Sequence, residues 1–257
     1  DTINIGISNT AAQTVFKLDA SEFETISITT DDSAATATNI AHVITTLDAT
    51  AATSLTIAGD AGLTIGTLTG TALTTINASN VTAGAVTITT GALAAAATIN
   101  GGAGNDVISA AAALAAVTLN GNAGNDYLIG GTVADVINGG AGNDILLGGA
   151  GADALTGGEG RDMFTVLTAT HSNGTTVDTV SDFVSGTDFL SAGNHAIVYA
   201  GEAASYGTVL TSLTSTAYQA VMDTSTKTVY IDVDGSGTLD AADIAITLNV
   251  SDLSQTD

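Results

Sequence analysis

From Gly121 the sequence reads GNAGNDYLI, GGTVADVIN, GGAGNDILL, GGAGADALT and GGEGRDMFT, five units that begin at residues 121, 130, 139, 148 and 157. A sixth copy, GGAGNDVIS, begins at Gly101, and the Ala-rich stretch 110–120 between it and Gly121 is interpreted as a degenerate unit without a glycine turn. A strict period of nine marks a repeat architecture, in which each unit is one small element that stacks on its neighbours.

Each unit joins a Gly-rich hexad to a triad with one central apolar residue. Glycine allows the backbone conformations of a tight turn, and the triad predicts a short strand whose central side chain points inward. Two nine-residue units make one coil of 18 residues, so Asp residues of alternate units are expected to stack on the same flank. The central apolar residues are Ile108, Leu128, Ile137, Leu146, Leu155 and Phe164.

The rest of the chain predicts further β-structure on both sides of this block. Residues 1–100 are rich in Thr and Ala, with short alternating strands such as 55–57 and 98–100 that are expected to stack on the same solenoid. Strand-like runs at 196–199, 228–233 and 244–250 predict a β-rich cap or a second domain. The expected fold is an all-β parallel solenoid with three parts, which are 1–100, 101–165 and 166–257.

One segment predicts a helix instead. Ile40, Val43, Ile44 and Leu47 are spaced as an apolar helical stripe, and Asn39 is a suitable cap. We therefore expect one short packing helix within residues 33–48.

Composition excludes several classes of partner. The 26 acidic residues against three basic ones give a net charge of −23, which argues against nucleic acid and against an anionic membrane surface. No apolar run approaches the length of a membrane helix, so no membrane insertion is expected. Without Cys there is no disulfide and no thiolate metal site. A folded chain this acidic repels itself unless cations lie among the carboxylates.

The nonapeptide resembles the repeat GGxGxDxUx of the RTX proteins, a calcium-binding β-roll. The units at 101, 139, 148 and 157 match fully, whereas Asn122 replaces the second Gly of one unit and Val133 replaces the fourth-position Gly of another. The resemblance implies several Ca²⁺ ions, held by the Asp side chains and by the carbonyls at the second and fourth positions. These positions are Gly102, Gly104, Asp106, Asn122, Gly124, Asp126, Gly131, Val133, Asp135, Gly140, Gly142, Asp144, Gly149, Gly151, Asp153, Gly158, Gly160 and Asp162.

The same spacing predicts which Asp side chains stack. Asp106 and Asp126 are 20 residues apart rather than 18, so their stacking is the least regular. The segment DTVSDFVSGTDFLS after the repeats resembles the closing segment of RTX metalloproteases, where Asp178, Asp182 and Asp188 are either ligands of a last calcium or ordinary turn carboxylates. The regular pairs are Asp126 with Asp144, Asp135 with Asp153, and Asp144 with Asp162.

A second candidate calcium loop lies far from the repeats. DVDGSGTLDAAD, residues 232–243, resembles an EF-hand loop with Gly237 at its sixth position. It departs from that pattern with Ser at the fifth position and the shorter Asp at the twelfth, and its flanks are strand-like rather than helical. The ligands implied are Asp232, Asp234, Ser236, the Thr238 carbonyl, Asp240 and Asp243.

No catalytic motif is present, because HExxH and GxSxG are absent and the three histidines are isolated. We therefore expect no enzyme. The RTX resemblance implies export by a type I secretion machinery and a place outside the cell. The first hypothesis is a surface-layer (S-layer) protein that folds with calcium and self-associates into a lattice on the cell surface. The others are a non-catalytic secretion and folding module of an extracellular protease or lipase, and an adhesin or ice-binding solenoid.

Overall fold

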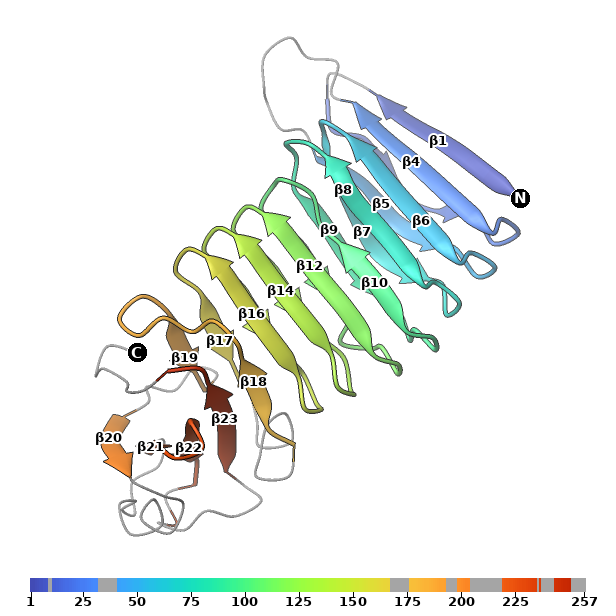
Figure 1. Cartoon of the computed structure of the whole chain (residues 1–257). Coiled ribbons are helices and arrows are strands. Elements are labelled where there is room, and N and C mark those ends of the chain that lie inside the picture. Colours follow the sequence, from blue (N-terminus) through green and yellow to red (C-terminus); the bar gives the residue numbers. More distant parts are fainter. Residues whose placement is uncertain are drawn as a thin grey trace.

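The computed structural model describes residues 1–8, 11–31, 41–166, 176–192, 198–203, 219–234, 236 and 243–250. Within these ranges the chain is all-β and contains no helix. It winds into a β-solenoid of stacked coils, with the N-terminus at one end and the C-terminal strands at the other (Figure 1).

Each coil contributes one strand to each of two facing sheets, so neighbours in a sheet come from successive coils. The 13-stranded sheet, here sheet A, has the order β1-β4-β6-β8-β10-β12-β14-β16-β18-β23-β22-β21-β20. Its pairs are parallel from β1 to β23. Its solenoid strands are β1 (Thr2–Ser8), β4 (Thr25–Asp31), β6 (Ser54–Gly59), β8 (Thr75–Val81), β10 (Ala97–Asn100), β12 (Val117–Ala123), β14 (Val136–Ala141), β16 (Ala154–Glu159) and β18 (Asp178–Val180).

The 10-stranded sheet, here sheet B, has the order β19-β17-β15-β13-β11-β9-β7-β5-β2, and β3 also pairs with β5. In the repeat block the strands of sheet B are only three residues long, as the nonapeptide predicts. Its strands are β2 (Thr14–Val15), β3 (Leu18–Asp19), β5 (Ala41–Asp48), β7 (Gly62–Thr69), β9 (Val86–Thr90), β11 (Val107–Ser109), β13 (Tyr127–Ile129), β15 (Ile145–Leu147), β17 (Met163–Thr165) and β19 (Phe189–Ser191).

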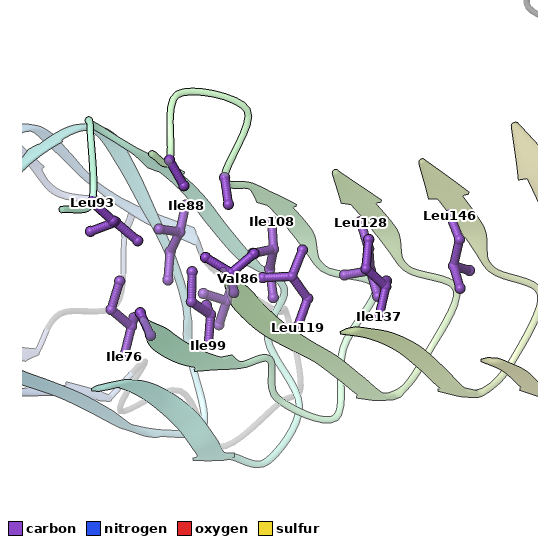
Figure 2. Packing of buried hydrophobic residues seen from close by; sticks show 14 of the residues in the cluster. Ile76, Val86, Ile88, Leu93, Ile99, Ile108, Leu119, Leu128, Ile137 and Leu146 are labelled. Atoms are coloured by element: carbon purple, nitrogen blue, oxygen red, sulfur yellow. The ribbon is translucent and has the colours of Figure 1, made fainter. Parts of the chain in front are cut away.

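The core is a double column of aliphatic side chains between the two sheets. Because side chains alternate along a strand, one apolar residue per triad points inward and stacks on its equivalent in the next coil. In sheet A, Ile99 pairs with Leu119 and Leu119 with Ile137. In sheet B, Ile108 pairs with Leu128. Figure 2 shows these fully buried side chains meeting between the sheets.

The upstream Thr/Ala-rich region stacks on the same solenoid, as predicted. Its coils are longer than those of the repeat block, and the extra residues lie in the connections and in longer strands with local register shifts, while Leu55 still pairs with Ile76 and Ile76 with Ile99. The predicted 18-residue coil is confirmed where Leu128 pairs with Leu146.

The predicted helix is wrong where the structure describes it. Residues 41–48 form strand β5, and 33–40 lie outside the described residues. His42 and Ile44 alternate inward before a local shift brings Leu47 inward. This strand has parallel neighbours on both sides, β2 and β7, whose hydrogen bonds outweigh the weak helical preference of a short stripe. The β-branched residues in the segment also favour a strand.

The C-terminal described region is β-structured, as the strand-like runs predict. Strand β23 (Ile244–Leu248) continues sheet A beside β18, and β22 (Thr228–Asp232) and β21 (Gln219–Asp223) follow in antiparallel pairs. Strand β20 (Val198–Ala203) lies at the edge. No helix in the described ranges is long and apolar enough to span a bilayer.

Truncating one inward side chain tests this core. We expect Leu119→Ala to lower the free energy of unfolding by about 2–5 kcal/mol, because Leu119 is fully buried and the cavity cannot collapse between two fixed coils. Thr118→Ala, the outward neighbour on the same strand, is the control and should change it by less than about 0.5 kcal/mol. Urea unfolding in saturating calcium measures both, and equal losses would contradict the stacked core.

Candidate calcium sites

Five Asp side chains form a continuous ladder along one flank of the repeat block. The backbone N–H of Asp126 donates to Oδ1 of Asp144 at 2.7 Å, and the N–H of Asp144 donates to Oδ1 of Asp162 at 2.9 Å. Asp106 donates to Asp126 in the same way at 2.7 Å, so the two-residue insertion between them is absorbed outside the turn. The ladder ends where Asp162 donates to Asp188 at 3.0 Å. We call this the first ladder.

A second ladder runs along the opposite flank. The N–H of Asp135 donates to Oδ1 of Asp153 at 2.8 Å, and the N–H of Asp153 donates to Oδ1 of Asp178 at 3.0 Å. The predicted pairs therefore stack. Asp178 and Asp188, which lie beyond the nonapeptide period, occupy the ladder positions of a further coil.

Both ladders begin on coils that carry an apolar residue at the same position. The N–H of Val86 donates to Oδ1 of Asp106 at 2.7 Å, and the N–H of Val117 donates to Oδ1 of Asp135 at 2.8 Å. Val86 and Val117 are buried core residues. Each ladder thus begins with an N–H from a coil that has no acidic side chain at that position, and one coil further upstream the N–H of Leu63 donates to the backbone carbonyl of Ala85 instead. Sequence reasoning missed these two positions, although the regular phase of the apolar residues upstream was a usable signal for them within this chain.

The glycine turns that carry the Asp residues are of two kinds. In the turns at 101 and 130, the N–H of Gly102 or Gly131 donates to Oδ2 of the turn's own Asp at 2.5 Å, and we call these closed turns. In the four other turns the second and fourth residues have positive φ, and we call these open turns. The φ values are 78° and 115° for Asn122 and Gly124, 119° and 140° for Gly140 and Gly142, 98° and 137° for Gly149 and Gly151, and 106° and 132° for Gly158 and Gly160.

Three of the four open turns leave a buried carboxylate oxygen without a partner. Oδ2 of Asp126, Asp144 and Asp153 is buried and accepts no hydrogen bond. A buried acceptor without a partner costs about 1–3 kcal/mol, and more when it is charged. Each open turn stacks on another repeat turn one coil earlier, whereas the two closed turns are the first of their flank and stack on turns outside the repeats, at Ala78 and Val81 or at Ala110 and Ala113. The unpartnered oxygens therefore lie where two glycine turns face each other.

Burial sets the charge state of these Asp residues. Desolvation raises the pKa of Asp126 to about 7, partly offset by the N–H of Asp106, and the neighbouring carboxylates raise it further. Desolvation likewise raises the pKa of Asp106, Asp153 and Asp162 to about 6. It also raises the pKa of the two remaining repeat Asp residues, Asp135 and Asp144.

These donors fit calcium. The unpartnered groups are hard carboxylate oxygens, and carbonyl oxygens of the following coil lie near two of them: a Cβ at Gly121 would meet both Oδ2 of Asp126 and the carbonyl oxygen of Gly139, and a Cβ at Gly139 would meet both Oδ2 of Asp144 and that of Gly157. A Cβ at Gly142 would overlap the carbonyl oxygen of Gly124, which shows how closely successive turns stack. Ca²⁺ takes six to eight oxygen ligands in irregular shells, and carbonyl–carboxylate sets without nitrogen or sulfur suit it. A cation between the turns would satisfy the orphaned oxygens and relieve the repulsion within each ladder.

The three Asp residues of the closing segment after the repeats accept different hydrogen bonds. Asp182 accepts N–H bonds from Gly157 and Gly158 at 2.9 and 2.8 Å, so both its oxygens close the last repeat turn. Oδ2 of Asp188 accepts the N–H of Val184 at 2.8 Å, as in a closed turn. Asp178 and Asp188 end the two ladders, whereas Asp182 holds the backbone of the preceding coil.

The EF-hand-like loop connects β22 and β23, as the strand-like flanks predict. Carboxylate oxygens of Asp232, Asp234 and Asp243 lie within 4.8 Å of one another, and Asp232 and Asp243 are buried. The N–H of Ser236 donates to Asp234 at 2.8 Å, which curls the loop around this cluster. Thr238 and Asp240 lie outside the described residues, so the structure brings together the first, third and last positions of the loop.

Comparison with known families agrees with this geometry. The family model of the RTX calcium-binding nonapeptide repeat (4 copies) matches residues 96–112, 116–136 and 129–164. No curated protein matches the chain. The fold and the ladders thus define a calcium-binding β-roll, and the repeats that build it are RTX repeats, which bind several Ca²⁺ ions in a structural role. RTX repeats occur in secreted bacterial proteins, which indicates an extracellular location.

The raised pKa values predict an inverted pH dependence without calcium. An Asp whose pKa is about 6 or 7 in the folded state and near 3.8 when unfolded binds more protons when folded, so stability falls as pH rises through that window. In chelator, we expect the melting temperature to rise between pH 7.5 and pH 5. In calcium, it should fall over the same range, because protons compete for the ligands.

Thermal melts followed by circular dichroism, in chelator and in calcium, measure these opposite pH dependences of the melting temperature. Added salt is the control, because it screens the general repulsion of a chain with net charge −23 but not that of buried groups. Parallel pH profiles in chelator and in calcium would contradict the assignment of buried, metal-free carboxylates.

Proposed function

We propose that this chain is part of a secreted surface-layer protein, in which calcium drives folding of the roll and the folded roll assembles into a lattice. The observation that carries the proposal is the pair of buried Asp ladders. They make the folded roll electrostatically unfavourable without a divalent cation, and they leave it as a long rigid rod when the cation is bound. A rod whose fold depends on external calcium suits a protein that is exported unfolded and becomes structural outside the cell.

The proposed ligands follow the two kinds of turn. Supporting the assignment, the open turns combine an unpartnered Asp oxygen with glycine backbones that approach each other closely, whereas the closed turns use their own N–H for that oxygen. We assign the calcium ions to the clefts between successive glycine turns of each flank. The strongest sites use Asp126, Asp144 and Asp153, and those of Asp106 and Asp135 are weaker. A further ion lies in the loop of Asp232, Asp234 and Asp243.

The chain's three proposed parts differ in whether they carry calcium ligands. Residues 1–100 form coils without Asp at the ladder positions, 101–165 carry the six repeat Asp residues of the two ladders, and 166–257 close the roll and carry the separate acidic loop. The type I secretion machinery is the proposed export route.

Electron microscopy of the purified chain, in chelator and then in millimolar calcium, tests the assembly. We expect dispersed particles in chelator and ordered sheets in calcium. Compact monomers in calcium at every concentration would overturn the surface-layer proposal and leave the chain as a secretion and folding module.

An ice-binding face is a second candidate, because the register aligns outward hydroxyl groups that look irregular in the sequence. Thr75, Thr98 and Thr118 form one outward column on sheet A. Neighbouring coils place such side chains about 4.8 Å apart. Thermal hysteresis of the calcium-loaded chain measures ice binding. The substitution Thr98→Tyr, in the middle of the column, should abolish the hysteresis. A freezing point equal to that of buffer would exclude this function.

A further inference from the structure

Sheet B changes its outward surface where the calcium block begins. In the upstream coils the column just before the inward residue contains Val43 and then Thr64 and Thr87, and from β11 onward every member of the same column is apolar. Three of its members, Val107, Tyr127 and Met163, are 36–37% exposed. Ile145 and Phe189 complete it and are half-buried. We call the column of Val107, Tyr127, Ile145, Met163 and Phe189 the apolar strip, which the register holds in line.

The strip is unusual because an outward side chain does not contribute to the core. Core packing cannot explain why Tyr127 or Met163 is apolar, since the inward positions of those strands are Leu128 and Phe164. Exposed apolar side chains that line up over successive coils mark a contact surface rather than chance.

The strip is also flanked by columns without acidic residues. On one side the turn residues form an amide ladder, in which the N–H of Asn125 donates to Asn105 at 2.8 Å and the N–H of Asn143 donates to Asn125 at 2.7 Å. Arg161 ends that ladder, and its guanidinium lies 4.0 Å over the ring of Phe189. The column on the other side is Ser109, Ile129, Leu147, Thr165 and Ser191.

Charge decides which partner suits this face. The chain carries 26 acidic residues, yet these three columns contain none, and their single charge is the cation of Arg161. The Asp ladder beneath them points inward and is buried. Two copies of so acidic a chain repel each other over most orientations, but here they can approach without bringing carboxylates together.

We propose that the apolar strip is a contact between two copies of this chain, with sheet B of one roll packed face to face on sheet B of another. This proposal rests on the proposed function and names the surface through which the chains would associate. Packed sheets lie about 10 Å apart, a distance that side chains of this size fill.

The size of the strip sets the strength of the contact. Five coils span about 19 Å and three columns about 13 Å. That is on the order of 250 Å², well below the roughly 800 Å² per partner of a standard stable interface. One such contact is therefore weak and gains strength only when it is repeated along an array. The contact is also calcium-dependent, because the strip exists only while the coils are stacked.

The double variant Tyr127→Ser/Met163→Ser tests the strip in the full chain. Both side chains point outward, so the calcium-induced change in circular dichroism should be retained. The protein concentration at which half the chain associates in millimolar calcium should rise on the order of tenfold or more, measured by sedimentation velocity. Raising the salt should not weaken association of the wild-type chain, because the contact is apolar and salt screens the remaining repulsion.

The matched control is Val136→Ser, which removes an equally apolar side chain, 44% exposed, from the outward face of sheet A. It should shift the association midpoint less than twofold. If the double variant associates like the wild type, or if Val136→Ser weakens association more, the strip is not the contact, although the assembly itself stands. If the folded wild-type chain never associates, both the strip and the surface-layer proposal fail.

Discussion

In chelator, the coils from 101 to 166 are expected to be far less stable than those from 41 to 100, and to melt at a lower temperature. The physical reason is the change at the ladder position, from the buried aliphatic Val86 and Val117 to buried Asp side chains. Each calcium bound only by the folded roll adds about 2.7 kcal/mol at a hundredfold excess over its dissociation constant. Several such sites together match the whole stability of an ordinary domain, about 5–15 kcal/mol.

Hydrogen exchange measured by mass spectrometry separates the two regions. Amides of β6 to β9 should stay protected in chelator, whereas those of β13 to β17 should exchange much faster and regain protection when calcium is restored. Magnesium at the same concentration is the control, since it prefers a compact octahedral shell with bound waters and should restore little protection. Full protection of β13 to β17 in chelator would show that the ladders tolerate the missing cation.

The substitution Asp144→Asn should affect the melting temperature in opposite directions in chelator and in calcium. Asp144 lies in the middle of the first ladder, where Oδ1 accepts the N–H of Asp126 and Oδ2 has no partner. The amide can keep the Oδ1 bond but removes the charge. In chelator the variant should melt at the same temperature as the wild type or higher, because a buried carboxylate repelled by its neighbours is gone. In calcium it should melt lower and need on the order of tenfold more calcium to fold.

Glu159→Gln is the matched control for Asp144→Asn. It removes the same charge from an exposed position of a neighbouring repeat turn and should leave both calcium midpoint and melting temperature nearly unchanged. Calcium titrations followed by circular dichroism measure the two variants together. Equal shifts of the calcium midpoint for the substitutions at Asp144 and at Glu159 would mean that net charge, and not the ladder, governs folding.

Predictions from the sequence succeeded where a local period sets the structure. The nine-residue period of the block from Gly121 specifies the coil length, the inward position of Leu128 and Leu146, and the stacking of Asp126 on Asp144. These follow from backbone geometry alone, since a glycine turn plus a three-residue strand can close only one kind of coil. The helix predicted within 33–48 is wrong over 41–48, because a short apolar stripe fits the period of a helix as well as that of a strand. Only pairing with the neighbours β2 and β7 selects the strand.

The sequence by itself determined the repeat, the solenoid, the hard oxygen chemistry and therefore calcium. Tertiary structure alone decided which turns are open, because the φ angles at Gly102 and Gly140 differ although both follow a glycine in similar motifs. The coil beneath accompanies this difference: a turn that stacks on another repeat turn is open, and the first turn of each flank, which stacks on a turn outside the repeats, is closed. Likewise, the alignment of Val107, Tyr127 and Met163 into one outward strip depends on register between coils, which no single segment encodes.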